Sequence, residues 1–166
     1  GGRVLYIAKD SKEYSVTITK DTFGKKKVFT AADAKVLAEL KNAVEVVFQH
    51  PDTADDWVAP LKGLTGLKKL HLEKTKITDK ALGTIAGLAD LEYLNVYKTG
   101  VTDAGLDKLN KLKKLKSLYL WQTKVTEAKA KTFQAAMSKV GNKDLAINLG
   151  VDKDLRSVNT IARLKT

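Results

Sequence analysis

The sequence contains no cysteine, only two prolines and few aromatic residues among its 166 positions. Without cysteine, the chain has no disulfide scaffold, no thiolate zinc site and no covalent c-type haem attachment of its own. No segment approaches the roughly 18 to 20 consecutive apolar residues that a membrane helix needs. Acidic residues are also scarce, with 19 against 30 lysines and arginines, which leaves a net charge of +11. Because 43% of the residues are hydrophobic, we expect one folded domain with a buried core.

What the sequence does contain is a repeat of 24 residues. Three copies of the pattern Leu-x-x-Leu-x-Leu/Val begin at Leu67, Leu91 and Leu115, and a degenerate copy begins at Ala43. The second half of each unit starts with Thr-Asp or Thr-Glu and then places apolar residues at every third position. This pattern indicates one strand and one short helix in each unit. Thr78 or Asp79 is placed to cap such a helix, and the helix dipole favours Asp79 there. A period of this length is typical of leucine-rich repeats.

The repeats resemble those of the leucine-rich-repeat family over residues 31–149. The resemblance is closer to bacterial repeats whose second half reads T-x-[IV]-T-D-x-G-L, which residues 75–82, 99–106 and, more weakly, 123–130 match. We therefore predict an α/β leucine-rich-repeat solenoid, a short right-handed horseshoe with about five parallel strands on its concave face. Helices would cover the convex face, and a β-rich cap would close the N-terminal end.

The resemblance also bears on location and partners. Similar repeats occur in large proteins of planctomycetes and related bacteria, often attached to c-type haem modules outside the cytoplasm. The resemblance thus implies a bacterial, extracytoplasmic protein, periplasmic or secreted, and a haem-containing assembly whose haem lies on another segment or another protein. The chain begins with Gly1-Gly2-Arg3, without a methionine or a signal-peptide hydrophobic segment, so we expect it to be processed or excised.

The two ends of a solenoid need caps, because the terminal repeats would otherwise expose their core. We expect residues 1–30 to form an N-terminal β-hairpin cap, 31–149 the solenoid and 150–166 a C-terminal cap or tail. The hairpin is expected to turn at residues 9–12. The pattern leaves residues 152–166 ambiguous between a helix and a mobile end.

Two further positions recur every 24 residues. Asn42, Gly66, Asp90 and Lys114 lie where each helix returns to the next strand. The first three tolerate the left-handed conformation that ends a helix, and Lys114 departs from this pattern. A threonine follows each strand, and we expect its hydroxyl to bond to the backbone of the turn. The members of this threonine ladder are Thr75, Thr99 and Thr123.

Candidate catalytic residues are few. Nucleophilic catalysis needs a base beside a serine, threonine or cysteine, and the only histidines are His50 and His71. Asp55 and Asp56 stand at a predicted helix start, where acidic residues typically act as caps. We therefore predict a protein that is not an enzyme and that uses no cofactor and no metal. An enzyme would require one of the histidines against a carboxylate in a closed pocket.

The strand residues that point away from the core carry the most informative side chains. Alternation sends every second strand residue to the open side of the sheet, where four aromatic residues on two neighbouring strands are expected to form one contiguous patch. Exposed aromatic clusters commonly mark recognition sites, so we predict a face that binds a protein or peptide of unknown identity. A second interpretation stays open, in which the rings cover the sheet or a terminal cap folds over them. The predicted binding residues are Lys69, His71, Tyr93, Asn95, Tyr97, Ser117, Tyr119 and Trp121.

Lysines supply an alternative function. They cluster within residues 108–116 at one edge of the predicted sheet, and at Lys74, Lys76, Lys98 and Lys124 at the opposite edge. Such edges suggest an electrostatic module for an anionic polymer, either nucleic acid or an acidic glycan. Nucleic acid is disfavoured, because the sequence separates the lysines from the aromatic residues on which bases would stack. We interpret the lysines as a solubilising rim around a nearly neutral face.

Overall fold

The computed structural model describes residues 2–6, 12–19, 30–151 and 158–161 of the chain. Its strands are β1 (Gly2–Tyr6), β2 (Tyr14–Thr19), β3 (Ala43–Gln49), β4 (Lys69–His71), β5 (Tyr93–Asn95), β6 (Ser117–Tyr119), β7 (Ala146–Val151) and β8 (Val158–Ile161). Its α-helices are α1 (Ala31–Ala34), α2 (Asp55–Val58), α3 (Asp79–Ile85), α4 (Asp103–Leu106) and α5 (Glu127–Lys139). Three of them continue as 3-10 helices, η2 (Lys35–Glu39), η3 (Ala59–Gly63) and η4 (Asp107–Lys111).

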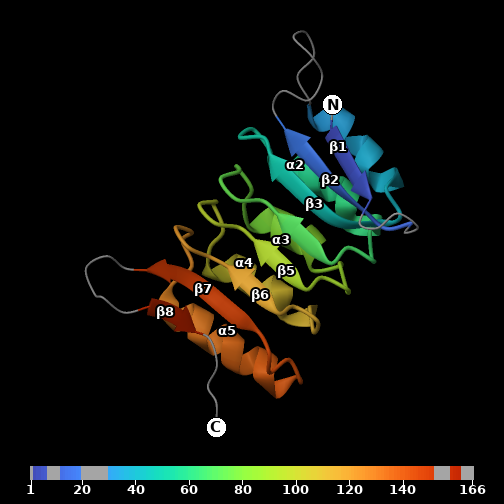
Figure 1. The fold of residues 1–166 in the computed structure, drawn as a ribbon. Coiled ribbons are helices and arrows are strands. Elements are labelled where there is room, and N and C mark those ends of the chain that lie inside the picture. Colours follow the sequence, from blue (N-terminus) through green and yellow to red (C-terminus); the bar gives the residue numbers. More distant parts are fainter. Residues whose placement is uncertain (1, 7–11, 20–29, 152–157, 162–166) are drawn as a thin grey trace.

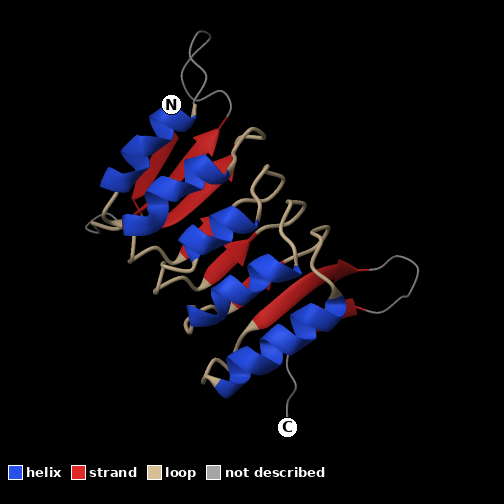
Figure 2. Ribbon diagram, turned by 180° about the vertical axis from the view of Figure 1, so that it is seen from behind, coloured by secondary structure: helices blue, strands red, loops and turns tan. Residues whose placement is uncertain are grey.

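The strands form a single sheet in chain order (Figure 1). Neighbours from β2 to β7 run parallel, whereas β1 and β8 pair antiparallel at the two edges. Helices cover one face of the sheet, and the described residues place no helix on the other face (Figure 2). This is the α/β leucine-rich-repeat solenoid that the sequence predicts. It has six parallel strands rather than about five, because β2 pairs along its whole length with β3.

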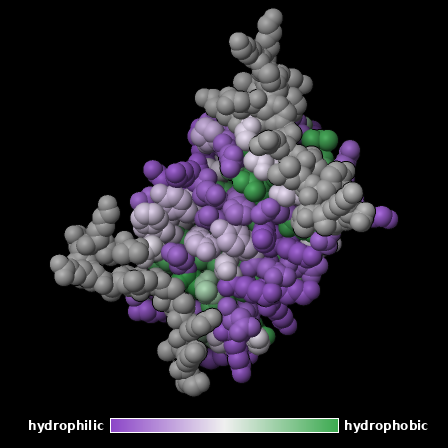
Figure 3. Space-filling view, in the orientation of Figure 1, coloured by the Kyte–Doolittle hydropathy of each residue, from purple (hydrophilic) through white to green (hydrophobic). Residues whose placement is uncertain are grey.

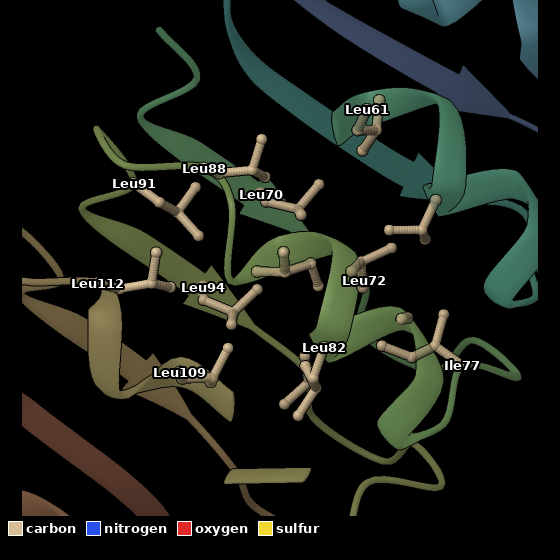
Figure 4. Packing of buried hydrophobic residues seen from close by; sticks show 14 of the residues in the cluster. Leu61, Leu70, Leu72, Ile77, Leu82, Leu88, Leu91, Leu94, Leu109 and Leu112 are labelled. Atoms are coloured by element: carbon tan, nitrogen blue, oxygen red, sulfur yellow. The ribbon is translucent and has the colours of Figure 1, made fainter. Parts of the chain in front are cut away.

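Equivalent leucines of successive repeats stack in register to make the core. Leu70 of β4 lies beside Leu94 of β5, which lies beside Leu118 of β6, and all three are fully buried. Leu82 and Leu109 meet these strands from the helical layer (Figure 4). A single repeat has only one strand and one helix with which to cover its apolar side chains. Each repeat therefore depends on its neighbours for burial.

Threonine is the N-cap residue of α1, α3, α4 and α5, whereas α2 begins after Ala54. Thr78, Thr102 and Thr126 are the N-cap residues of α3, α4 and α5, and each hydroxyl accepts a hydrogen bond from a backbone N–H two or three residues further on. Thr30 begins α1 in a capping box with Asp33. These bonds satisfy backbone donors that the first turn of a helix leaves without partners.

The aspartate after each capping threonine joins one repeat to the next. Asp79 accepts hydrogen bonds from the backbone N–H of Thr102 at 2.8 Å and from its hydroxyl at 2.6 Å. Asp55 binds Thr78 in the same way, and Asp103 binds Thr126. The prediction that Asp55 and Asp56 cap their own helix is wrong, because the N-cap residue of α2 is Ala54 and no side chain caps this helix. The three aspartates instead bind the N-cap threonine of the following helix.

The threonine ladder is confirmed, but the left-handed positions are not where the sequence placed them. The hydroxyls of Thr75, Thr99 and Thr123 donate to carbonyls three residues earlier, at 2.6–2.7 Å. Asn42, Gly66 and Asp90 do not adopt positive φ. The 3-10 helices end instead through residues such as Leu64, with φ −89° and ψ 60°. The non-glycine residues with positive φ in the described part are Lys74, Lys98 and Gln122, at 54–58°, in the turns that leave β4, β5 and β6.

The C-terminal end also differs from expectation. The sequence pattern predicts a helix or a mobile end for residues 158–161. They form strand β8 instead, which pairs antiparallel with β7. The two N-terminal strands pair antiparallel as expected. Residues 9–11 of the expected hairpin turn lie outside the described residues, as do 152–157 and 162–166.

The aspartate clamp predicts a large effect of one substitution. Asp79→Ala leaves the Thr102 N–H and hydroxyl without their acceptor, so we expect the free energy of unfolding in urea to fall by about 1–3 kcal/mol. Asp107→Ala is the matched control, because Asp107 is exposed and its carboxylate pairs with Lys129 at 2.7 Å. Its loss should stay below about 1 kcal/mol. Equal losses in the two variants would show that the clamp contributes no more than a surface ion pair.

Candidate functional site

The predicted binding residues all lie on the face of the sheet opposite the helices. Their side chains are half-buried, except for the exposed Lys69 and Trp121. Figure 3 shows this face, on which residues of intermediate hydropathy lie among hydrophilic ones. From β4 to β6 the rows are Lys69, Tyr93 and Ser117, then His71, Asn95 and Tyr119, and finally the two residues that follow strands, Tyr97 and Trp121.

The four aromatic residues meet in two pairs. The rings of Tyr97 and Trp121 stack with 5.0 Å between their centroids and 15° between their planes. Tyr93 meets Tyr119 diagonally across β5 and β6, at 5.2 Å and 42°. His71 extends this second pair, with its ring 4.6 Å from that of Tyr93. Stacked and tilted rings at these separations attract each other beyond the area that they bury.

His71 stands between two carboxylates on the open face. Its Nε2 lies 3.4 Å from Oε1 of Glu45, and its Nδ1 lies 3.7 Å from Oε1 of Glu73. The second oxygen of Glu45 accepts a hydrogen bond from the hydroxyl of Ser15 at 2.8 Å. Partial burial acts to raise the pKa of Glu73, but hydrogen bonds from His71 and the backbone, together with the charge of Lys74, outweigh it and hold this pKa below its ordinary value.

Burial and its neighbours also perturb Tyr93. Burial raises the pKa of the Tyr93 hydroxyl, and Tyr119 adds to this, while a hydrogen bond with Asn95 opposes it. The Asn95 side chain is partly committed to the backbone, because its Oδ1 accepts from the N–H of Tyr97 at 3.0 Å. Asn148 binds the N–H of Gly150 in the same way on β7. Asn95 therefore helps to hold the position of Tyr97.

Gly150 is part of the site, although it is not among the binding residues predicted from the sequence. It has φ +84°, and a Cβ atom built on it would collide with the indole of Trp121. The indole is thus held between the ring of Tyr97 and the backbone of β7. No signal in the repeat identifies this contact, because the spacing changes between β6 and β7.

Ion pairs between repeats neutralise several of the lysines. Lys116 binds Glu92 and Lys114 binds Asp90, both at 2.6 Å and both 24 residues apart. At the opposite edge Lys76 binds Asp52, again at 2.6 Å. These pairs join equivalent positions of neighbouring repeats, so the period that aligns the leucines also aligns opposite charges.

The predicted separation of lysines from aromatic residues is wrong at one edge. The Nζ atom of Lys74 lies 5.8 Å from the centroid of the Tyr97 ring, within the range of a cation–π interaction. The sequence places Lys74 and Tyr97 in different repeats. The inter-repeat register brings them together.

The two histidines lie in different surroundings, one buried and one on the open face of the sheet. His50 is 1% exposed, and its Nδ1 accepts a hydrogen bond from the backbone of Asp52 at 3.1 Å. Its ring packs against that of Trp57 at 4.9 Å. His71 does meet carboxylates, but on the open sheet. The residues that the structure describes hold no cluster suited to a metal ion and no helix long and apolar enough to cross a membrane.

Comparisons with known proteins return partial structural likenesses. No family model and no curated protein matches the sequence. Internalin C2 of Listeria monocytogenes is 19% identical at a TM-score of 0.44, with 64% of this chain and 61% of that one covered. A second internalin of that organism is 22% identical at a TM-score of 0.42, with 67% of this chain and 36% of that one covered. A leucine-rich-repeat protein of Leptospira interrogans is 18% identical at a TM-score of 0.44, with 69% of this chain and 33% of that one covered. The chain spans less than two thirds of each of them.

The depressed pKa of Glu73 predicts a pH dependence. The folded state favours the ionised carboxylate, so this contribution to stability is present above the unfolded pKa and is lost as the pH falls through the folded value. We expect Glu73→Gln to weaken the fall in the free energy of unfolding below about pH 5. Glu39→Gln, which removes the same charge from η2, is the control and should keep the wild-type slope. The prediction would be contradicted if the free energy of unfolding fell with pH in both variants as steeply as in the wild type.

The Trp121–Gly150 contact predicts a second measurable effect. Gly150→Ala adds a methyl group where the indole lies and places a side chain at positive φ, so we expect a loss of about 1–2 kcal/mol of stability. The displaced Trp121 should shift the tryptophan emission of the folded protein to longer wavelength. Gly83→Ala is the control, because nothing lies within 4 Å of a Cβ atom at that position. Unchanged emission in Gly150→Ala would argue against the contact.

Proposed function

We propose that this protein is a non-catalytic recognition module that binds a protein or peptide partner through the aromatic face of its sheet. The supporting observation is the pairing of Tyr93 with Tyr119 and of Tyr97 with Trp121 on the face opposite the helices. Trp121 keeps 41% of its surface exposed and is one of three exposed large hydrophobic residues in the described part of the chain.

The chemistry of this face suits a protein surface or a peptide. Tyrosine and tryptophan offer apolar ring area together with a polar atom, which is why they recur as anchors in protein interfaces. The rings are held in place by one another and by Gly150, so binding would cost little side-chain entropy. Lys69, His71, Asn95 and Ser117 would supply polar contacts around them. We assign no cofactor to this function.

The alternative function is the binding of an anionic polymer along the lysine-rich edges. The contact of Lys74 with Tyr97 favours it, because charge and ring are then available on one surface. The pairing of Lys76, Lys114 and Lys116 with acidic residues weighs against it. The resemblance to T-D-x-G-L repeats stays a prediction, as do the extracytoplasmic location and the haem-containing partner.

The test uses the paired variant Tyr119→Ala/Trp121→Ala. Peptides would be selected from a displayed random library on the immobilised wild-type protein and then measured by fluorescence anisotropy. Truncation of two anchor residues typically costs at least about 2 kcal/mol, so we expect the affinity of the selected peptides to fall about 30-fold or more.

The matched control is Val36→Ala/Val140→Ala, which truncates the other two exposed large hydrophobic residues. It should bind the selected peptides as the wild type does. Circular dichroism would show that both double variants are folded. Selected peptides that bind the aromatic variant as tightly as the wild type would refute the proposed site.

A further inference from the structure

We propose that the edge of the sheet where β4, β5 and β6 end is a subsite for the carboxylates of an acidic peptide segment, formed by Lys74, Lys98 and Lys124 beside the Tyr97–Trp121 pair. This inference rests on the proposed function, since it specifies the partner of the same face. The turns that carry the lysines follow the three strands side by side (Figure 1).

Left-handed turns place two of these lysines beside the aromatic residues. Lys74 and Lys98 have φ of 58° and 54°, and each donates its backbone N–H to the carbonyl of an aromatic residue one repeat later. The distance from the backbone nitrogen of Lys74 to the carbonyl oxygen of Tyr97 is 2.8 Å, and that from Lys98 to Trp121 is 2.9 Å. Short side chains such as asparagine are the usual non-glycine choice for this conformation, whereas both repeats use lysine here. The backbone of each turn therefore lies against that of the next aromatic residue, and the Nζ atom of Lys74 lies 5.8 Å from the centroid of the Tyr97 ring.

The three lysines bring positive charge to this edge, and the neighbouring Glu73 partly offsets the charge of Lys74. Among the described residues none of them forms an ion pair, in contrast to Lys76, Lys114 and Lys116, which are each paired at 2.6 Å. The only acidic residue within the turns 73–78, 97–102 and 121–126 is Glu73. Its carboxylate lies 3.7 Å from Nδ1 of His71. The turns of Lys98 and Lys124 contain no acidic residue of their own, and Asp79 and Asp103 bind the threonines that end them.

A peptide fits this edge better than a continuous polyanion. The three cations occupy one short edge, while Glu45 and Glu73 on the adjoining face would repel phosphates or sulfates that continued across it. A peptide carries its carboxylates at separate positions and can present aromatic or apolar side chains between them. Net positive charge on the whole protein would also speed its encounter with an acidic segment.

The experiment compares three labelled decapeptides in which tyrosine alternates with glutamate, glutamine or lysine. By fluorescence anisotropy at about 0.15 M ionic strength, we expect the glutamate peptide to bind about tenfold more tightly than the glutamine peptide, as three exposed ion pairs would provide. Lys74→Gln/Lys98→Gln/Lys124→Gln should abolish this preference. Glutamine is a conservative choice, because Gln122 already adopts the same left-handed conformation in the third repeat.

The matched control is Lys35→Gln/Lys62→Gln/Lys111→Gln, which removes the same charge from exposed positions in η2, η3 and η4. It should keep the preference for the glutamate peptide. The inference is overturned if the glutamate peptide does not bind, if it binds no better than the glutamine or lysine peptide, or if both triple variants weaken it equally.

Two further arms separate this inference from its alternatives. The first uses a heparin fragment or a single-stranded oligonucleotide. If it binds more tightly than the glutamate peptide, and if Lys74→Gln/Lys98→Gln/Lys124→Gln (the edge variant) loses this affinity, the edge belongs to a polyanion instead. If Tyr119→Ala/Trp121→Ala weakens all three peptides while the edge variant changes nothing, the acidic subsite fails and the proposed function stands. If the aromatic variant weakens none of them, the proposed function fails.

Discussion

The parallel register between repeats of 24 residues is the constraint on which the rest of this structure depends. Leu70, Leu94 and Leu118 can be buried only if each strand lies beside the next with equivalent residues aligned. A shift of one residue would turn every apolar side chain to the open face. Because burial of these columns drives folding, the register is specified in each repeat and then propagates along the solenoid.

The same register places chemically matched groups on the two sides of the sheet. On the helical side, Asp79 reaches the capping threonine of the following helix, so helix starts and repeat spacing support each other. On the strand side, the tight turn after each strand takes up the left-handed conformation at Lys74, Lys98 and Gln122. The aspartate–threonine bonds and the left-handed turns account for positions that the hydrophobic pattern alone leaves unexplained.

Charge in this basic protein is distributed rather than uniform. Several lysines meet acids one repeat away, and these contacts are exposed, so each contributes little to stability while lowering the local potential. Carboxylates appear on the open face at Glu45 and Glu73, where His71 stands between them. Lys74, Lys98 and Lys124, in the turns after β4, β5 and β6, form no ion pair within the described part of the chain. A net charge of +11 is therefore a poor guide to what any one surface binds.

The sequence by itself determined the repeat, the buried leucines, the capping threonines and the residues that share the open face, because strand and helix periodicities are local properties. Only the tertiary structure decided that Tyr97 stacks on Trp121, that Trp121 rests on Gly150 and that Lys74 lies over Tyr97. It also decided that the left-handed positions follow the strands and that the chain adds β8 as an edge strand. Periodicity predicts which face a side chain occupies, whereas its partner depends on the backbone of a neighbouring repeat.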